Sequence, residues 1–143
     1  MARTTAPAPA HLTPVALVLL LWQGLLAADY IVTRFVLGQP GWPQIMANLP
    51  LDTLWMRVCW ALSVWLGFAA AFFLTIRDNA SVLLFFAAAV AGGAVAVGLT
   101  LAGATAPGLP LSVPLNLLLA VQILVPLLGW LYARALNRTA VLH

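Results

Sequence analysis

The sequence predicts an all-α membrane protein with four transmembrane helices in an antiparallel bundle and both termini in the cytoplasm. Of its 143 residues, 64% are apolar and only 6% are charged, and the mean hydropathy is +1.08. A soluble domain carries roughly 25% charged residues. The apolar residues form four runs, each longer than the roughly 20 residues that cross a hydrocarbon core at about 1.5 Å per residue.

The first apolar run covers residues 14–37 and follows residues 1–13, a segment rich in Pro, Ala and Thr that we expect to be a flexible tail. A cleaved signal peptide is the alternative, because Arg3 precedes an apolar segment. The apolar pattern continues past any cleavage point near Ala28, which favours a spanning helix.

The other three runs cover residues 54–76, 80–103 and 114–135, and residues 136–143 form a short cytoplasmic tail. The connection "IRDNA" is so short that the second and third helices must form an antiparallel hairpin. "ATAPGLPLSVP" separates the third helix from the fourth. The first connection is longer and carries Trp42, which predicts a loop at the membrane interface; a substrate-gating loop is the alternative.

Six arginines and no lysine account for the basic charge, and they are scattered along the chain. A cytoplasmic N-terminus places four arginines inside and two outside, which is the arrangement that the positive-inside rule favours. The inside set is Arg3, Arg77, Arg134 and Arg138, and the outside set is Arg34 and Arg57.

Several functional classes are disfavoured by what the sequence lacks. There is no clustered basic patch for nucleic acid. Glutamate is absent, Cys59 is the only cysteine, and His11 and His143 lie near the two ends, so a metal site has few possible ligands. No serine has a histidine or lysine close by in the pattern of a nucleophile and its base. We therefore expect no enzyme, no cofactor and no metal.

Asp29 is the one acidic residue inside an apolar run, and Tyr30 and Thr33 follow it. Arg34 is five residues later, roughly 140° around a helix axis, and is a poor partner. Arg57 lies at similar depth if the first two helices are antiparallel. A carboxylate in a membrane helix must be paired, hydrated or protonated. An Asp29–Arg57 ion pair is the structural interpretation, and a proton or substrate site is the functional alternative.

Two glutamines are candidate intramembrane polar residues. Gln23 and Gln122 lie at comparable depth, and the simplest interpretation is a hydrogen bond between them. Pro126 removes the helical partner of the Gln122 carbonyl, which at this depth is alternatively an ion ligand.

Small residues recur four apart on the second and third helices, notably at Ser63, Gly67, Gly92 and Gly93. Such stripes allow helix backbones to approach closely in lipid. We expect packing within the hairpin; an oligomer contact is the alternative.

The placed runs resemble a family of small, uncharacterised four-helix bacterial inner-membrane proteins that are often labelled "sugar transporter". The resemblance rests on Asp29-Tyr30 with Thr33, on "WMRVCWALSVWLG" (55–67), on the short basic turn at Arg77 and on the closing "WLYAR" (130–134). The Ala/Gly tract of the third run and the proline-rich third loop depart from it.

The resemblance implies a multi-pass protein of the bacterial inner membrane and directs attention to Asp29, Tyr30 and residues 60–65. We expect a non-enzymatic accessory or interaction component, whose partners are the lipid bilayer and other membrane-protein subunits or further copies of itself. The alternative is a small oligomeric transporter of a small solute.

Overall fold

The computed structural model describes residues 7–35, 37, 42–139 and 141–142, and all regular structure in these ranges is helical. The four long helices are α1 (Leu12–Arg34), α2 (Leu54–Thr75), α3 (Ala80–Leu101) and α4 (Leu115–Arg138). Each is long and apolar enough to cross a membrane. Two short 3-10 helices, η1 (Met46–Asn48) and η2 (Pro110–Ser112), lie in the first and third connections. The predicted all-α fold with four such helices is confirmed.

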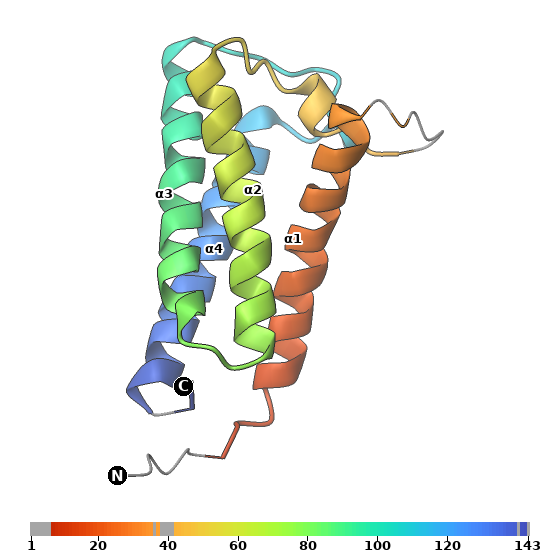
Figure 1. Ribbon diagram of the computed structural model, residues 1–143. Coiled ribbons are helices and arrows are strands. Elements are labelled where there is room, and N and C mark those ends of the chain that lie inside the picture. Colours follow the sequence, from red (N-terminus) through yellow and green to blue (C-terminus); the bar gives the residue numbers. More distant parts are fainter. Residues whose placement is uncertain (1–6, 36, 38–41, 140, 143) are drawn as a thin grey trace.

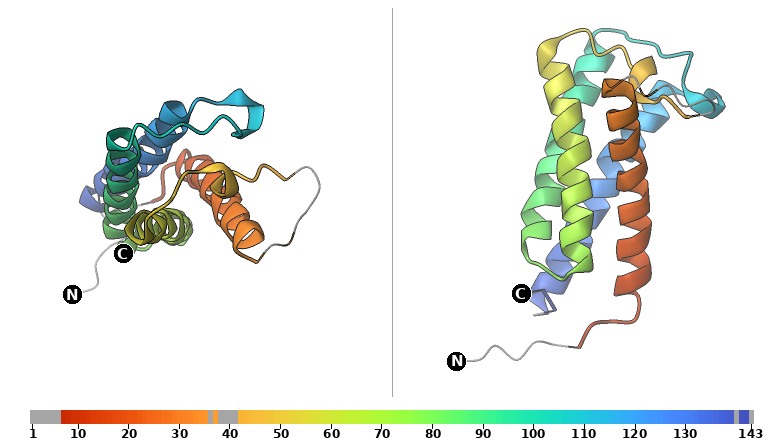
Figure 2. Two further views of the ribbon diagram at one scale, coloured as in Figure 1. Left: turned by 90° about the horizontal axis from the view of Figure 1, so that it is seen from above. Right: turned by 45° about the vertical axis from the view of Figure 1, so that its right-hand side comes forward.

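The helices run alternately up and down (Figure 1). The end that carries η1 and η2 is called the loop end, and the end that carries the α2–α3 connection is called the turn end. The first residue of α1 and the last of α4 both lie at the turn end. Helix α2 packs against α1 and α3, and α3 packs against α4, whereas α1 and α4 have no comparably close backbone contact. Seen along the bundle, α1 stands apart from the other three helices at the loop end (Figure 2).

Helices α2 and α3 end in the same C-terminal motif. After α2, Arg77 has a φ of 63° and the Asp78 N–H donates to the Phe73 carbonyl at 2.8 Å. After α3, Gly103 has a φ of 60° and the Ala104 N–H donates to the Leu99 carbonyl at 3.0 Å. A left-handed residue combined with this bond ends a helix abruptly. The third run therefore ends at 101 and not at 103.

The outer two helices differ more from the predicted bounds. Helix α1 begins two residues earlier and ends three residues earlier than expected, and α4 continues three residues beyond 135 to Arg138. Residues 136–138 contain no proline or glycine that would end α4. Arg138 places a cation in the last turn, where it interacts favourably with the helix dipole.

The two terminal segments pack against the bundle where the structure describes them. Leu12 is buried, and the His11 ring meets the Tyr132 ring edge-on, with centroids 5.7 Å apart. Val141 and Leu142 are also buried. His11 and Leu12, from the expected flexible tail, therefore pack against the bundle. Val141 and Leu142, from the short tail at the other end, join Leu12 in covering the turn end of the core. Residues 1–6 lie outside the described ranges.

Two apolar clusters fill the interior. The cluster at the loop end gathers around Trp60, Val64 and Leu99, and the cluster at the turn end gathers around Leu74 and Phe85. Between them lie the buried polar residues Gln23, Ser63 and Gln122.

Candidate functional site

Asp29 is buried near the loop end of α1, with 1% of its surface exposed. Its Oδ1 accepts hydrogen bonds from Trp42 Nε1 at 2.9 Å and from the Ile45 N–H at 3.0 Å. Its Oδ2 accepts one from the Met46 N–H at 2.8 Å. Three donors offset the cost of burying the carboxylate. Asp29 therefore fastens the first connection onto α1.

The predicted Asp29–Arg57 ion pair is wrong. Arg57, in the first turn of α2, donates from Nε to the Leu51 carbonyl at 2.8 Å. Leu51 belongs to the segment just before α2, so the Arg57 guanidinium is bound by the backbone that precedes its own helix. The carboxylate and the guanidinium each have backbone partners from the first connection, and no ion pair joins them.

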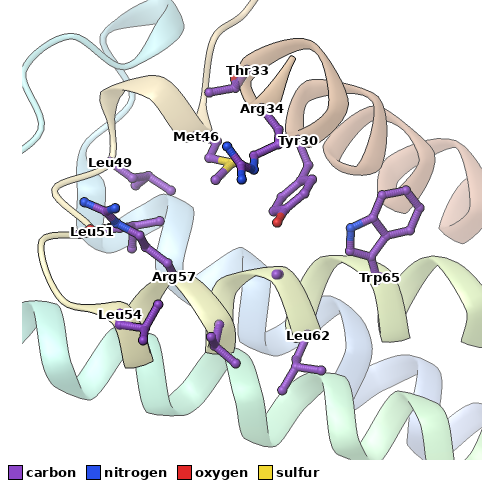
Figure 3. Close-up of a pocket in the computed structure, with 12 residues that line it drawn as sticks. Tyr30, Thr33, Arg34, Met46, Leu49, Leu51, Leu54, Arg57, Leu62 and Trp65 are labelled. Atoms are coloured by element: carbon purple, nitrogen blue, oxygen red, sulfur yellow. Dashed lines mark hydrogen bonds between the residues drawn. The ribbon is translucent and has the colours of Figure 1, made fainter. Parts of the chain in front are cut away.

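A pocket of about 770 Å³ opens between α1 and α2 at the loop end (Figure 3). Helix α1 contributes Tyr30, Thr33 and Arg34 to its wall. Arg57 and Trp65 are among the residues that α2 contributes. The first connection completes the wall with Met46, Leu49 and Leu51.

Three of the four candidate residues thus meet in one pocket, namely Tyr30, Thr33 and Arg57, whereas Asp29 does not line it. The rings of Tyr30 and Trp65 meet edge-on, with centroids 5.9 Å apart. From the sequence, Arg34 is an orientation signal and a poor partner for Asp29, and its place in the pocket wall was not predicted. Its position one helical turn after Tyr30 was the available clue.

A polar contact joins α4 to α2 in the middle of the bundle. The Gln122 amide donates from Nε2 to Ser63 Oγ at 2.9 Å. The predicted Gln23–Gln122 hydrogen bond is not formed, because Gln23 packs on Gly67 of α2. A methyl group at position 67 would lie 2.6 Å from Gln23 Oε1, so only glycine leaves room for this side chain.

The Gln23 amide is completely buried, and neither its oxygen nor its nitrogen has a hydrogen-bond partner among the described residues. Gln122 Oε1 is in the same situation. A buried amide without partners costs free energy, so this layer is the least satisfied part of the interior.

The small residues of α3 divide into two kinds. A methyl group at Gly92 would lie 3.0 Å from Ser63 Oγ and 3.3 Å from the Gln122 carbonyl oxygen, which is the carbonyl that Pro126 leaves without its helical partner. A methyl group at Gly93 would meet nothing within 4 Å. Gly92 therefore lies at a close helix contact. The expected packing within the bundle is not found at Gly93, where the alternative of an oligomer contact stays a prediction.

The described residues contain no group of three His, Cys, Asp or Glu side chains close enough to hold a metal ion. Ser63, the buried serine of α2, has its hydroxyl engaged by Gln122. No family model, curated protein or solved structure matches the chain. The family resemblance stays a prediction.

Proposed function

We propose that the chain is a non-enzymatic, multi-pass protein of a bacterial inner membrane that acts as an accessory or interaction component. The observation that carries this proposal is the bonding of Asp29. A carboxylate that serves a substrate or ion pathway faces a water-filled cavity or another ionisable group, whereas Asp29 does not line the pocket between α1 and α2. Both oxygens of Asp29 already hold backbone N–H groups and Trp42, so the only acidic residue of the apolar runs has a structural role.

The side of the bundle between α1 and α4 supports an interaction role. At the loop end a groove of about 360 Å³ is lined by α1, by α4 and by the first and third connections. Apolar residues line it, among them Trp22 and Leu25 from α1 and Val121 from α4. Since α1 and α4 are not in close backbone contact, a transmembrane helix of another subunit can pack there.

Co-purification tests this proposal. The intact protein, extracted in mild detergent, should carry a foreign membrane subunit in fixed stoichiometry, identified by mass spectrometry. Val121→Trp fills the groove and should release that subunit. Val90→Trp is the control, because Val90 is an exposed residue of α3 outside the groove. A pure homo-oligomer that carries a solute across vesicles would instead establish the alternative, a small transporter.

The proposed orientation puts both termini in the cytoplasm. Arg77, Arg134 and Arg138 belong to the turn end, and Arg34 and Arg57 belong to the loop end. A reporter fused to the C-terminus should be active in the cytoplasm, and one inserted within residues 104–113 should be active in the periplasm. A periplasmic C-terminus would overturn this orientation.

A further inference from the structure

We propose that the pocket between α1 and α2 binds a membrane lipid with an anionic phosphate headgroup. The phosphate would lie between Arg34 and Arg57, and an acyl chain would follow the apolar wall of α2. This inference rests on the membrane location proposed above and is independent of the accessory role.

Two guanidinium groups line the same pocket from facing helices. Arg34 belongs to the last turn of α1 and Arg57 to the first turn of α2 (Figure 3). Arg57 spends only its Nε on the Leu51 carbonyl, which leaves its other two nitrogens for a ligand. Arginine is the side chain best suited to binding phosphate through two parallel hydrogen bonds.

The chain supplies no acidic side chain to neutralise this pair. It has three acidic residues, all in the described ranges. Asp29 holds the first connection, and Asp78 accepts the Ala80 N–H at the turn end. Asp52 is exposed and does not line the pocket. Two cations around one cavity therefore favour an external anion.

The depth of the pocket suits a lipid. Helices of 22 to 24 residues are about 33 to 36 Å long, so their ends reach the headgroup region. Trp65 is eight residues after Arg57, about 12 Å further along the helix. Between them, Val58, Ala61 and Leu62 line the pocket. This apolar wall runs from the cationic rim toward the hydrocarbon core, as a lipid with one charged end requires.

Lipid retention by the purified full-length protein tests the inference. The protein is loaded from an equal mixture of phosphatidylglycerol and phosphatidylcholine, washed in mild detergent and analysed by native mass spectrometry. The parent should retain phosphatidylglycerol preferentially. The double variant Arg34→Gln, Arg57→Gln should lower that preference about tenfold, since it removes the charge-assisted hydrogen bonds to phosphate.

The matched control is Arg134→Gln with Arg138→Gln, which removes the same charge at the turn end and should keep the preference. An equal loss in both double variants, or no loss in the pocket variant, would overturn the inference. Ala61→Phe fills the apolar wall and keeps both arginines, so it tests the pocket even where the arginine variant does not fold. Retention by Ala61→Phe equal to the parent's would contradict the site.

The last arm separates a lipid from a free anion. Inorganic phosphate at millimolar concentration should leave the bound phosphatidylglycerol in place, because it cannot use the apolar wall. Complete displacement by phosphate would show a site for the free anion and refute the lipid. Loss of the foreign subunit described above would leave this measurement unchanged, so the two proposals fail separately.

Discussion

Replacing Asp29 by Asn tests how the first connection is held. Asparagine keeps one acceptor oxygen, which can serve Trp42 Nε1 and the Ile45 N–H as Oδ1 does now. Its amide nitrogen then faces the Met46 N–H, so one donor loses its acceptor. A hydrogen bond to a charged group contributes about 1.5–3 kcal/mol, and a stranded buried donor costs about 1–3 kcal/mol. We expect Asp29→Asn to lower the free energy of unfolding by about 2–4 kcal/mol.

The assay is unfolding of four proteins in one detergent: the parent, Asp29→Asn, Arg57→Gln and the double variant. Because the two side chains have separate partners, the double variant should be no more stable than Asp29→Asn alone. Trp42→Phe leaves both backbone donors in place and should cost less than Asp29→Asn. A double variant more stable than Asp29→Asn would support the Asp29–Arg57 ion pair. An Asp29→Asn protein with the same unfolding midpoint as the parent would refute the anchoring role.

The remaining predictions concern the interior. Gly92→Leu should destabilise the protein by about 1–3 kcal/mol through overpacking, whereas Gly93→Leu should leave the unfolding midpoint unchanged; equal effects would contradict the close approach at Gly92. Gln122→Met removes the hydrogen bond to Ser63 and should lower the free energy of unfolding by about 1 kcal/mol. Gln23→Met should be neutral or stabilising in the same unfolding assay, since its amide has no partner among the described residues; a clear loss would reveal a partner that the amide requires.

The helices were predictable because their apolar runs are bounded by strong signals. Asp78 and Asn79 precede α3, and Gly103 follows it, so the hairpin was placed within two residues. The end of α1 was less predictable. Residues 35–37 are as apolar as the helix before them, yet α1 ends at Arg34 with Phe35 as its C-cap, and no proline or glycine marks that end in the sequence.

The partner of Asp29 could not be found from the sequence. The sequence suggests a side chain of opposite charge as the partner of a carboxylate, whereas two of the three donors to Asp29 are backbone N–H groups. Every residue except proline carries such a donor, so no residue type marks it. Its position depends on the path of the loop. The third donor, Trp42, was visible, but it was interpreted as an interfacial anchor.

The polar interior was predicted in part. Gln23, Ser63 and Gln122 are all buried, and the expectation of a polar contact across helices is correct for Gln122. Its partner was assigned to the wrong helix, because Ser63 was interpreted only as a small packing residue. Which of two polar residues at one depth faces a given amide depends on helix rotation, which the weak periodicity of nearly uniform apolar helices does not determine.

The sequence separations of the polar contacts set an order in which the chain can satisfy them during synthesis. Asp29 and its donors are 13 to 17 residues apart, so the carboxylate can receive its hydrogen bonds as soon as the first connection is made, before α2 is complete. The hydrogen bond of Ser63 forms much later, because its partner Gln122 is 59 residues downstream. The loop end of α1 can therefore mature early, and the middle of the bundle matures only when α4 has been inserted.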